Sequence, residues 1–373
     1  MRIIYVNDAL AIWGGLERII VEKVNYLADE YGFEMHLITV NQGSHPVPYP
    51  LSPKVCYHDL DIRFHQQYQY SNIHRIFKKS QLNRLFIKRL RDYIQENRPD
   101  IIVSVRSELT AGIVKAKGDI PLVYESHTSR HAQRFIRADW YTRLKAEWYN
   151  RSARYAQMIV TLTEGDAADW REINPNVRVI PNIVHLNESG MISNCKAKSV
   201  IFVGRFSRQK DVNSLLQIWM LVHHNYPDWQ LQIYGGYGEE QDVILPKIDE
   251  MHANIQVHEP TKDIFDRYCE SSIFVLTSRF EPFGLVIPEA MSCGLPVVAF
   301  DCPYGPADII TDGQDGYVIK DRNIELFAQK ICKLINDYEL RVKMGQTGAF
   351  ASRRYSADLI MPKWQSLFSQ LIR

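Results

Sequence analysis

The feature that most constrains the fold is a repeated alternation of short apolar runs with longer segments of helical period. The runs are rich in β-branched residues. They read RIIYVN, MHLITVN, DIIVSV, PLVYES and QMIVTL in the first half, then SVIFVG, LQIYGG, IQVHE, SIFVLTS and PVVAF in the second. Continuous apolar runs of this length are typical of parallel strands that helices cover on both faces. The alternation therefore predicts an α/β fold of two Rossmann-like halves.

A break in this pattern separates the halves. Residues 181–198 are polar and turn-rich and keep no period, which predicts a linker. A chain of 373 residues is long enough for two domains. We expect an N-terminal domain over residues 1–185, a C-terminal domain over 186–355 and a last helix over 356–373.

Composition excludes several classes of protein. The 44 basic and 43 acidic residues nearly cancel, so no overall field attracts nucleic acid. No apolar run approaches the length of a membrane span, and the N-terminus does not resemble a signal peptide. The six cysteines are far apart, with no CxxC and no metal-ligand spacing. We expect a cytoplasmic protein, soluble or peripheral to the membrane, with reduced thiols and no metal or cofactor.

Two segments that follow predicted strands carry the candidate chemistry. In VGRFSRQKD, Arg205 and Lys210 suit a diphosphate. Arginine can donate two parallel hydrogen bonds to phosphate oxygens, and lysine adds a positive charge on a flexible side chain. In SRFEPFGLVIPEAMSCGLPVVAF, Gly284 lets the backbone approach a ligand, and Glu281 and Glu289 can accept hydrogen bonds from hydroxyl groups. Taken alone, each segment is better explained as a solvated loop.

Taken in order, the motifs resemble those of the family 4 retaining glycosyltransferases. EPFGLVIPEAMSCGLPVVA resembles the family's two-glutamate signature, VGRFSRQKD its donor-phosphate loop, and YGGYGEE the G-x-G that follows the next strand. The similarity is tight over about residues 199–320 and extends to bacterial surface-polysaccharide hexosyltransferases. It implies a GT-B architecture, in which two Rossmann-like domains face across a cleft and the last helix returns to the first domain.

The resemblance also assigns roles to residues. Arg205 and Lys210 would neutralise the donor diphosphate, Glu289 would hold the ribose, Glu281 would contact the transferred sugar, and His127 would lie near the reacting centre. The other implied donor-binding positions are Gly14, Gly15, Gly204, Gly235, Phe283, Gly284, Leu285 and Val286.

Two positions depart from the family pattern. Pro282 stands where many members have glycine, and Asp308 in CPYGPADII stands where glutamate is more usual. The first leaves the hydrogen bonds of this loop open, because proline stiffens it and lacks an N–H group.

The predicted function is metal-independent transfer of a hexose or N-acetylhexosamine, from a UDP-sugar by preference, to a glycan or lipid-linked glycan. A GDP-mannose-dependent enzyme and a non-catalytic nucleotide-sugar-binding protein remain alternatives. A nicotinamide oxidoreductase is disfavoured because no G-x-G-x-x-G follows a predicted strand, and a P-loop enzyme because the chain has no G-x-x-x-x-G-K-[ST].

Two further segments bear on partners. Residues 75–91 carry seven cations and no acid, interleaved with apolar residues. They predict either contact with the inner face of the membrane or a helix with one buried and one solvated face. The aromatic and basic run over residues 130–155 is a candidate acceptor groove, although Trp148 and Tyr149 are expected in the core.

Overall fold

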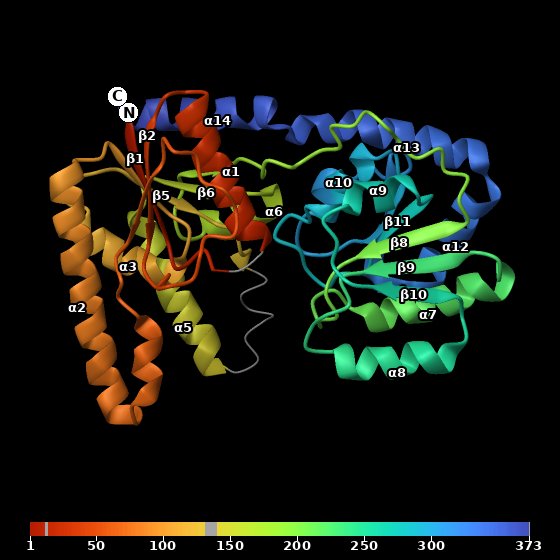
Figure 1. Ribbon diagram of the computed structural model, residues 1–373, viewed down its shortest axis with the longest axis horizontal. Helices are drawn as coiled ribbons and strands as arrows, with labels where there is room; N and C mark the ends of the chain where they lie inside the picture. The colour runs from red at the N-terminus through yellow and green to blue at the C-terminus, as the bar shows by residue number, and fades with distance from the viewer. Residues whose placement is uncertain (12–13, 131–139, 373) are drawn as a thin grey trace. The chain divides into compact units, whose positions relative to one another are not determined.

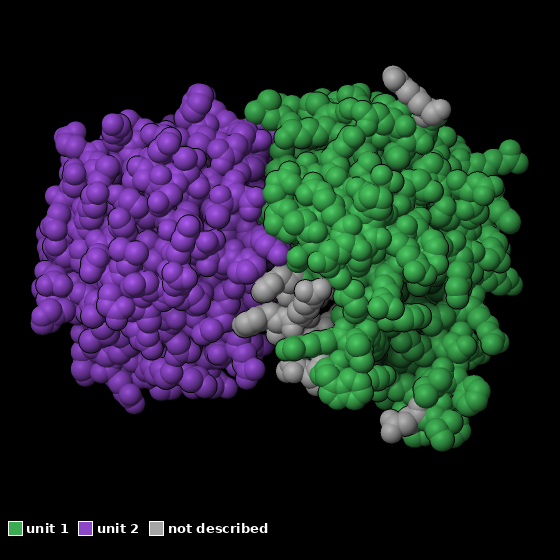
Figure 2. All heavy atoms as spheres, turned by 180° about the vertical axis from the view of Figure 1, so that it is seen from behind, with its two compact units in different colours: residues 1–183, 358–373 green, residues 184–357 purple. Residues whose placement is uncertain are grey.

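The computed structural model describes residues 1–11, 14–130 and 140–372. They form two compact units, one of residues 1–183 with 358–373 and the other of residues 184–357 (Figure 2). The expected domain bounds differ from these units by two residues at each junction. The chain therefore enters the second unit once and returns to the first with its last helix.

The first unit is a parallel seven-stranded sheet with helices on it (Figure 1). Its strands are β1 (Arg2–Asn7), β2 (Glu34–Thr39), β3 (Cys56–Asp59), β4 (Ile101–Ser104), β5 (Leu122–Glu125), β6 (Met158–Thr161) and β7 (Val177–Val179). Its helices are α1 (Gly15–Asp29), α2 (Asn72–Asn97), α3 (Ser107–Ala116), α5 (Trp140–Asn150), α6 (Glu164–Arg171) and α14 (Ala357–Leu371), with a 3₁₀ turn η1 (Phe64–Gln69) before α2. The strand order is β3-β2-β1-β4-β5-β6-β7.

The second unit is a parallel six-stranded sheet of order β10-β9-β8-β11-β12-β13. Its strands are β8 (Ser199–Val203), β9 (Gln230–Tyr234), β10 (Ile255–His258), β11 (Ile273–Leu276), β12 (Val297–Phe300) and β13 (Gly316–Ile319). Its helices are α7 (Val212–Asn225), α8 (Gln241–Met251), α9 (Ile264–Cys269), α10 (Val286–Ser292), α11 (Pro306–Ile309), α12 (Ile324–Asn336) and α13 (Tyr338–Ser352). The prediction of two parallel α/β halves is confirmed.

Burial explains the sequence pattern from which the fold was predicted. All four residues of each of the strands β4, β5, β11 and β12 are buried, so these strands need apolar side chains on both faces. Helix α7 instead buries one stripe, which includes Leu215, Trp219 and Val222 and belongs to the core around β8 and β9. That spacing is the helical period read in the sequence.

Both sheets reverse their strand order at one point, between β1 and β4 in the first unit and between β8 and β11 in the second. In open parallel sheets, ligands bind beyond the carboxyl ends of the strands at such a point. The residues that follow these four strands are therefore the ones to examine for a site. Within the described residues, no helix has both the length and the apolar content needed to cross a bilayer.

Candidate functional site

The second unit brings Lys210 and Glu281 into contact at its switch point. Lys210 follows β8 and Glu281 follows β11, and Nζ of Lys210 lies 2.6 Å from Oε1 of Glu281. The Ser278 hydroxyl donates to the same oxygen at 2.7 Å. Glu281 is only 4% exposed, and a carboxylate this buried is costly unless it is paired. Two residues predicted to act on different parts of the donor thus share one contact.

Two glycines let the loops after β8 and β9 approach closely. Gly235 has a φ of +118°, and a Cβ there would lie 2.8 Å from the carbonyl oxygen of Gly204. A Cβ on Gly204 would in turn lie 3.3 Å from the Lys210 side chain. Any larger residue at position 235 would separate the loops. Arg205 is exposed directly beyond Gly204, so both cations lie at the carboxyl edge of β8.

The loop over residues 283–285 offers backbone rather than side chains. The ring of Phe283 is buried and packs edge-on against Tyr355 at 5.2 Å between centroids. Gly284 has a φ of +92°. Within the part of the chain that the structure describes, the N–H groups of Phe283, Gly284 and Leu285 donate to no backbone carbonyl. These donors remain available for a ligand.

Helix α10 begins at Val286, which places Pro288 in its first turn, where proline is tolerated. Glu289 lies in the same turn and is largely buried. The loop around Pro282 is pinned by two backbone hydrogen bonds, from Glu281 N to the Pro303 carbonyl at 3.1 Å and from Tyr304 N to the Glu281 carbonyl at 2.7 Å. Asp308 is exposed in α11.

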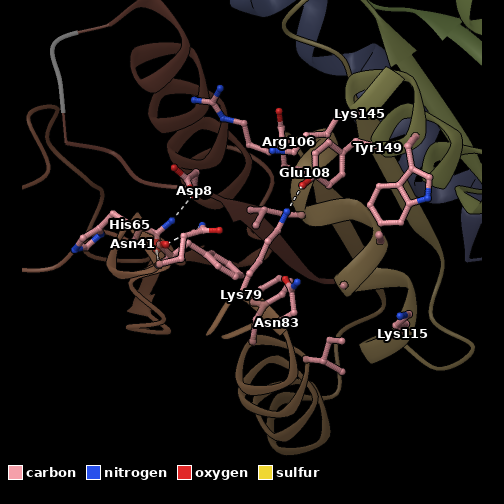
Figure 3. Close-up of a pocket in the computed structure, with 18 of the residues that line it drawn as sticks. Asp8, Asn41, His65, Lys79, Asn83, Arg106, Glu108, Lys115, Lys145 and Tyr149 are labelled. Atoms are coloured by element: carbon pink, nitrogen blue, oxygen red, sulfur yellow. Dashed lines mark hydrogen bonds between the residues drawn. The ribbon is translucent and has the colours of Figure 1, made fainter. Parts of the chain in front are cut away.

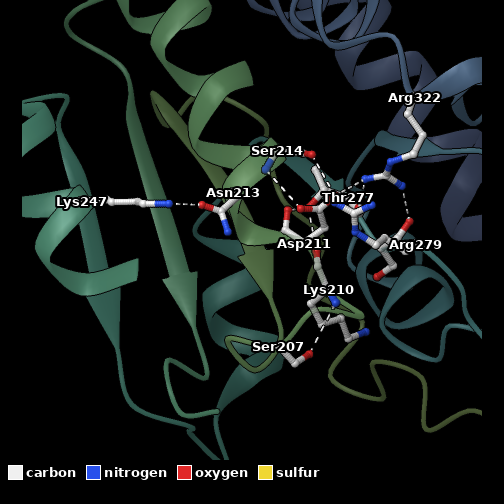
Figure 4. Close-up of polar contacts among 10 residues, drawn as sticks. Ser207, Lys210, Asp211, Asn213, Ser214, Lys247, Thr277, Arg279 and Arg322 are labelled. Carbon is white, nitrogen blue, oxygen red and sulfur yellow. Dashed lines mark hydrogen bonds and ion pairs between the residues drawn. The ribbon is translucent and has the colours of Figure 1, made fainter. Parts of the chain in front are cut away.

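A second layer of charge holds the Lys210 loop (Figure 4). Asp211 is buried at the N-terminus of α7, in a left-handed conformation with φ +49°, and caps the helix through Ser214. Its Oδ2 accepts from Arg322 at 2.6 Å and lies 2.9 Å from Arg279. The Thr277 hydroxyl donates to the carbonyl of Lys210 at 2.9 Å. Sequence reasoning missed this network because its members come from three separate segments, residues 210–214, residues 277–279 and Arg322.

The remaining predicted residues lie in the first unit. Gly14 is the N-cap of α1 in an extended conformation, and Gly15 is the first residue of the helix. His127 follows β5, and its Nε2 lies 3.0 Å from Oε1 of the buried Glu125. Glu125 also pairs with Lys23 of α1. Sequence reasoning missed this pair, although one signal was present: Lys23 interrupts the apolar face of α1.

The first unit also contains a cavity of about 890 Å³, lined by residues after β1, β2 and β4 and by helices α2, α3 and α5 (Figure 3). Asp8 lies beside Asn41, and Lys79 donates to the Tyr149 hydroxyl at 2.9 Å. Arg106, Glu108, Lys115, Lys145 and Trp148 are also among its lining residues. The cavity combines cations with aromatic faces.

Part of the run predicted to line an acceptor groove thus lies at this cavity, in α5, whereas residues 131–139 lie outside the described residues. The expectation that Trp148 is a core residue is wrong: its side chain is 62% exposed. Tyr149 is only partly buried. Helix α5 buries Ala146 and Asn150 and exposes Trp140, Tyr141 and Trp148.

Comparison with known proteins identifies both halves. A model described as Glycosyltransferase Family 4 matches residues 13–188, and one described as Glycosyl transferases group 1 matches residues 192–349. The chain is 29% identical to the amylovoran biosynthesis glycosyltransferase AmsD of Erwinia amylovora, over 99% of each chain. It is also 31% identical to an uncharacterized glycosyltransferase of Haemophilus influenzae, over 56% of this chain and 60% of that protein.

A solved structure shares the fold. A mutant of Staphylococcus aureus TarM in complex with fondaparinux, α-GlcNAc-glycerol and UDP superposes with a TM-score of 0.77 at 16% identity, over 98% of this chain and 99% of that one. Because the two family models together match most of both units, the chain belongs to the family 4 glycosyltransferases and has the GT-B fold.

Proposed function

We propose that this glycosyltransferase moves a hexose or N-acetylhexosamine, with retention of configuration and without a metal ion, from a UDP-sugar to a glycan or lipid-linked glycan in surface-polysaccharide biosynthesis. The contact between Lys210 and Glu281 carries the proposal. It places a cation suited to a diphosphate beside a carboxylate suited to sugar hydroxyls. The N–H groups of the loop over residues 283–285 add donors for oxygen atoms at the same edge.

Stabilising the leaving group is the main chemical task. The bond between the anomeric carbon and the diphosphate oxygen breaks, and negative charge grows on the departing nucleotide. Lys210 turns from Glu281 toward the phosphates, Arg205 joins it, and Glu281 is then free to accept from sugar hydroxyls. Glu289 holds the ribose. These cations supply the positive charge that a divalent ion would otherwise provide, which is why no metal is proposed.

Retention is proposed to follow a front-face route. The acceptor oxygen attacks the anomeric carbon on the face that the diphosphate leaves, and a departing phosphate oxygen takes the acceptor proton. The new bond therefore forms with the configuration of the old one. His127 contacts the transferred sugar.

The similarity to a protein of amylovoran biosynthesis and to a structure crystallised with UDP favours a UDP-sugar and a polysaccharide acceptor. The cavity of the first unit is proposed as the acceptor site, because aromatic faces such as Trp148 stack on sugar rings and its cations suit charged acceptor groups. The exposed apolar residues of α2 and α5 next to it are proposed to touch the inner face of the cytoplasmic membrane.

Release of nucleotide from a panel of UDP- and GDP-sugars, with and without EDTA, tests the function. We expect UDP release from a UDP-hexose or UDP-N-acetylhexosamine, unchanged by EDTA. Release only from GDP-mannose would favour the mannosyltransferase. Tight UDP binding without release from any donor, with or without membrane extract as acceptor, would favour a non-catalytic binding protein. Loss of release in EDTA would refute metal independence.

A further inference from the structure

A charged cluster is buried beneath His127 in the first unit. Glu125 at the end of β5 is completely buried, and Lys23 of α1 is 1% exposed. The Lys23 ammonium donates to Oε1 of Glu125, and Nε2 of His127 lies 3.0 Å from the same oxygen. One carboxylate oxygen therefore joins a helix, a strand and the predicted catalytic histidine.

Packing alone does not account for these charges. Lys23 stands four residues from Ile19 and from Leu27, both buried on the same face of α1. An aliphatic side chain would continue this face without the cost of removing two charges from water. Replacing a buried ion pair by apolar groups is often neutral or stabilising. The pair is thus a poor device for stability alone.

The C-terminal helix closes the cluster from the other side. The Lys23 ammonium lies 4.0 Å from the ring centroid of Trp364, which is buried on α14. An aromatic face attracts a desolvated cation. Lys23 is therefore held between Glu125 and Trp364, and its position fixes that of the carboxylate.

The carboxylate can in turn fix the imidazole. Burial opposes ionisation of Glu125, but the charges of Lys23 and His127 outweigh it and lower the pKa of Glu125 to about 2. An ionised carboxylate 3.0 Å from Nε2 favours a proton on that nitrogen, so whenever the ring is neutral its acceptor is Nδ1, on the other side of the ring. A sugar hydroxyl is a suitable donor to Nδ1.

We propose that Glu125 is a positioning residue that sets the orientation and tautomer of His127, with Lys23 as its buried counter-ion. The inference rests on the proposed function, in which His127 contacts the transferred sugar. It adds two residues to the reaction that touch neither donor nor acceptor.

A double-mutant cycle on nucleotide release tests the proposal. Glu125→Gln keeps the shape of the side chain and should lower turnover on the order of tenfold, with UDP affinity unchanged because the residues proposed to bind the diphosphate and the ribose, Arg205, Lys210 and Glu289, lie in the second unit. In a His127→Gln background, Glu125→Gln should cause no further loss. Losses that multiply would contradict this inference alone. A His127→Gln variant as active as the wild type would contradict both the role of His127 and the inference.

A second variant separates positioning from stability. Lys23→Met and Glu125→Gln should each lower the melting temperature, because each leaves an uncompensated buried group. The double variant Lys23→Met/Glu125→Gln should regain melting temperature and keep the loss of turnover. Recovery of turnover together with stability would overturn the proposal, since the pair would then be structural.

The NMR resonances of the His127 imidazole ring can be measured without a sugar donor. The resonances of His127, identified by their absence in His127→Gln, should shift or broaden in Glu125→Gln. They should stay in place in Glu34→Gln, a matched control that breaks the Arg2–Glu34 pair at the amino ends of β1 and β2. Unchanged His127 resonances in Glu125→Gln would overturn the proposal.

Discussion

At the scale of single residues, the buried carboxylate of Asp211 supports the loop of Lys210, the residue proposed to bind the donor diphosphate. Arg322 donates to Asp211 at 2.6 Å and to the carbonyls of Thr277 and Ser278, each at 2.9 Å. Through these hydrogen bonds, Arg322 links the segment that contains Lys210 to the loop that contains Glu281. Removing Arg322 leaves three acceptors short of a donor in a partly buried place.

Arg322→Met should therefore lower the free energy of unfolding by about 2 kcal/mol and weaken UDP binding, because the Lys210 loop loosens. Urea unfolding and titration with UDP measure the two effects. The control is Lys247→Met, which removes an exposed hydrogen bond from Lys247 of α8 to Asn213 of α7. Equal UDP affinity in wild type and Arg322→Met would contradict the proposed support of the loop.

Asp166 predicts a pH dependence. Burial raises the pKa of this carboxyl to about 6, against the hydrogen bonds from Arg130 N and Ser126 that lower it. A carboxyl whose pKa is raised on folding stabilises the fold below its unfolded pKa, and the contribution is lost as pH rises through the folded pKa. The loss is up to about 3 kcal/mol.

Asp166→Asn should accordingly gain stability relative to wild type between about pH 4 and pH 7, as followed by urea unfolding at each pH. A difference between the two proteins that does not change over this range would show that Asp166 titrates normally.

Residues that belong to a recognisable motif could be named from the sequence. Residues whose role depends on contact between distant segments could not. Lys210 and Glu281 belong to strand-end motifs and were named from the sequence. Lys23 and Glu125 are 102 residues apart, and no local pattern pairs them. Only the lysine on an apolar helix face hinted at a buried partner.

At the scale of elements, α2 has the buried and the solvated face that one of its two alternatives predicted, and membrane contact stays a proposal. From Leu82 onward it buries Leu82, Phe86 and Leu90 in the core of the first unit. Before that point Ile76 and Phe77 are 70% and 71% exposed. The basic stretch is therefore a core helix whose first turns carry an unburied apolar face, as a membrane contact requires.

Ile76→Ser/Phe77→Ser should weaken binding to anionic vesicles at low salt several-fold, because apolar burial in the interface is lost, and leave the melting temperature unchanged. Met220→Ser/Leu221→Ser, an exposed apolar pair on α7, is the matched control. Co-sedimentation with phosphatidylglycerol vesicles measures binding. Equal binding by wild type and the α2 variant would refute the membrane contact at these residues.

Three strands escaped sequence analysis, and all three lie at the edge of a sheet. β3 reads CYHD and is mostly exposed, β7 has three residues of intermediate burial, and β13 begins at Gly316. Edge strands have one neighbour, and β3 and β7 are also little buried, so these two do not need the apolar runs that mark central strands. Strand β13 is mostly buried, but its apolar run is only the three residues Tyr317–Ile319. Apart from β10, the strands predicted from the sequence are central ones, where burial on both faces demands apolar side chains.

At the scale of the whole molecule, the first unit is completed by the end of the chain. Helix α14 buries Ile360, Met361, Trp364, Leu367 and Phe368, and residues 358–373 belong to the first unit. The sequence predicted a last helix from its period. That the helix returns came from the family resemblance, because a periodic pattern does not say which core it joins.

Trp364→Ala should cost about 3–5 kcal/mol of unfolding free energy by opening a cavity in the first unit and removing the aromatic face over Lys23. Trp140→Ala, at a side chain that is 73% exposed, should cost little and serves as the control. Chemical unfolding followed by circular dichroism measures both. A cost for Trp364→Ala as small as that of Trp140→Ala would mean that α14 does not complete this core.

The central claim is that Lys210, together with Arg205 and in contact with Glu281, forms the donor-diphosphate site of a glycosyltransferase. The most direct measurement is the rate of nucleotide release from the preferred donor by wild type, Lys210→Ala and Arg208→Ala, each with its melting temperature. We expect Lys210→Ala to lose most turnover with the fold intact, and Arg208→Ala, an exposed cation two residues away, to stay near the wild-type rate. A folded Lys210→Ala variant that releases nucleotide at the wild-type rate would contradict the account.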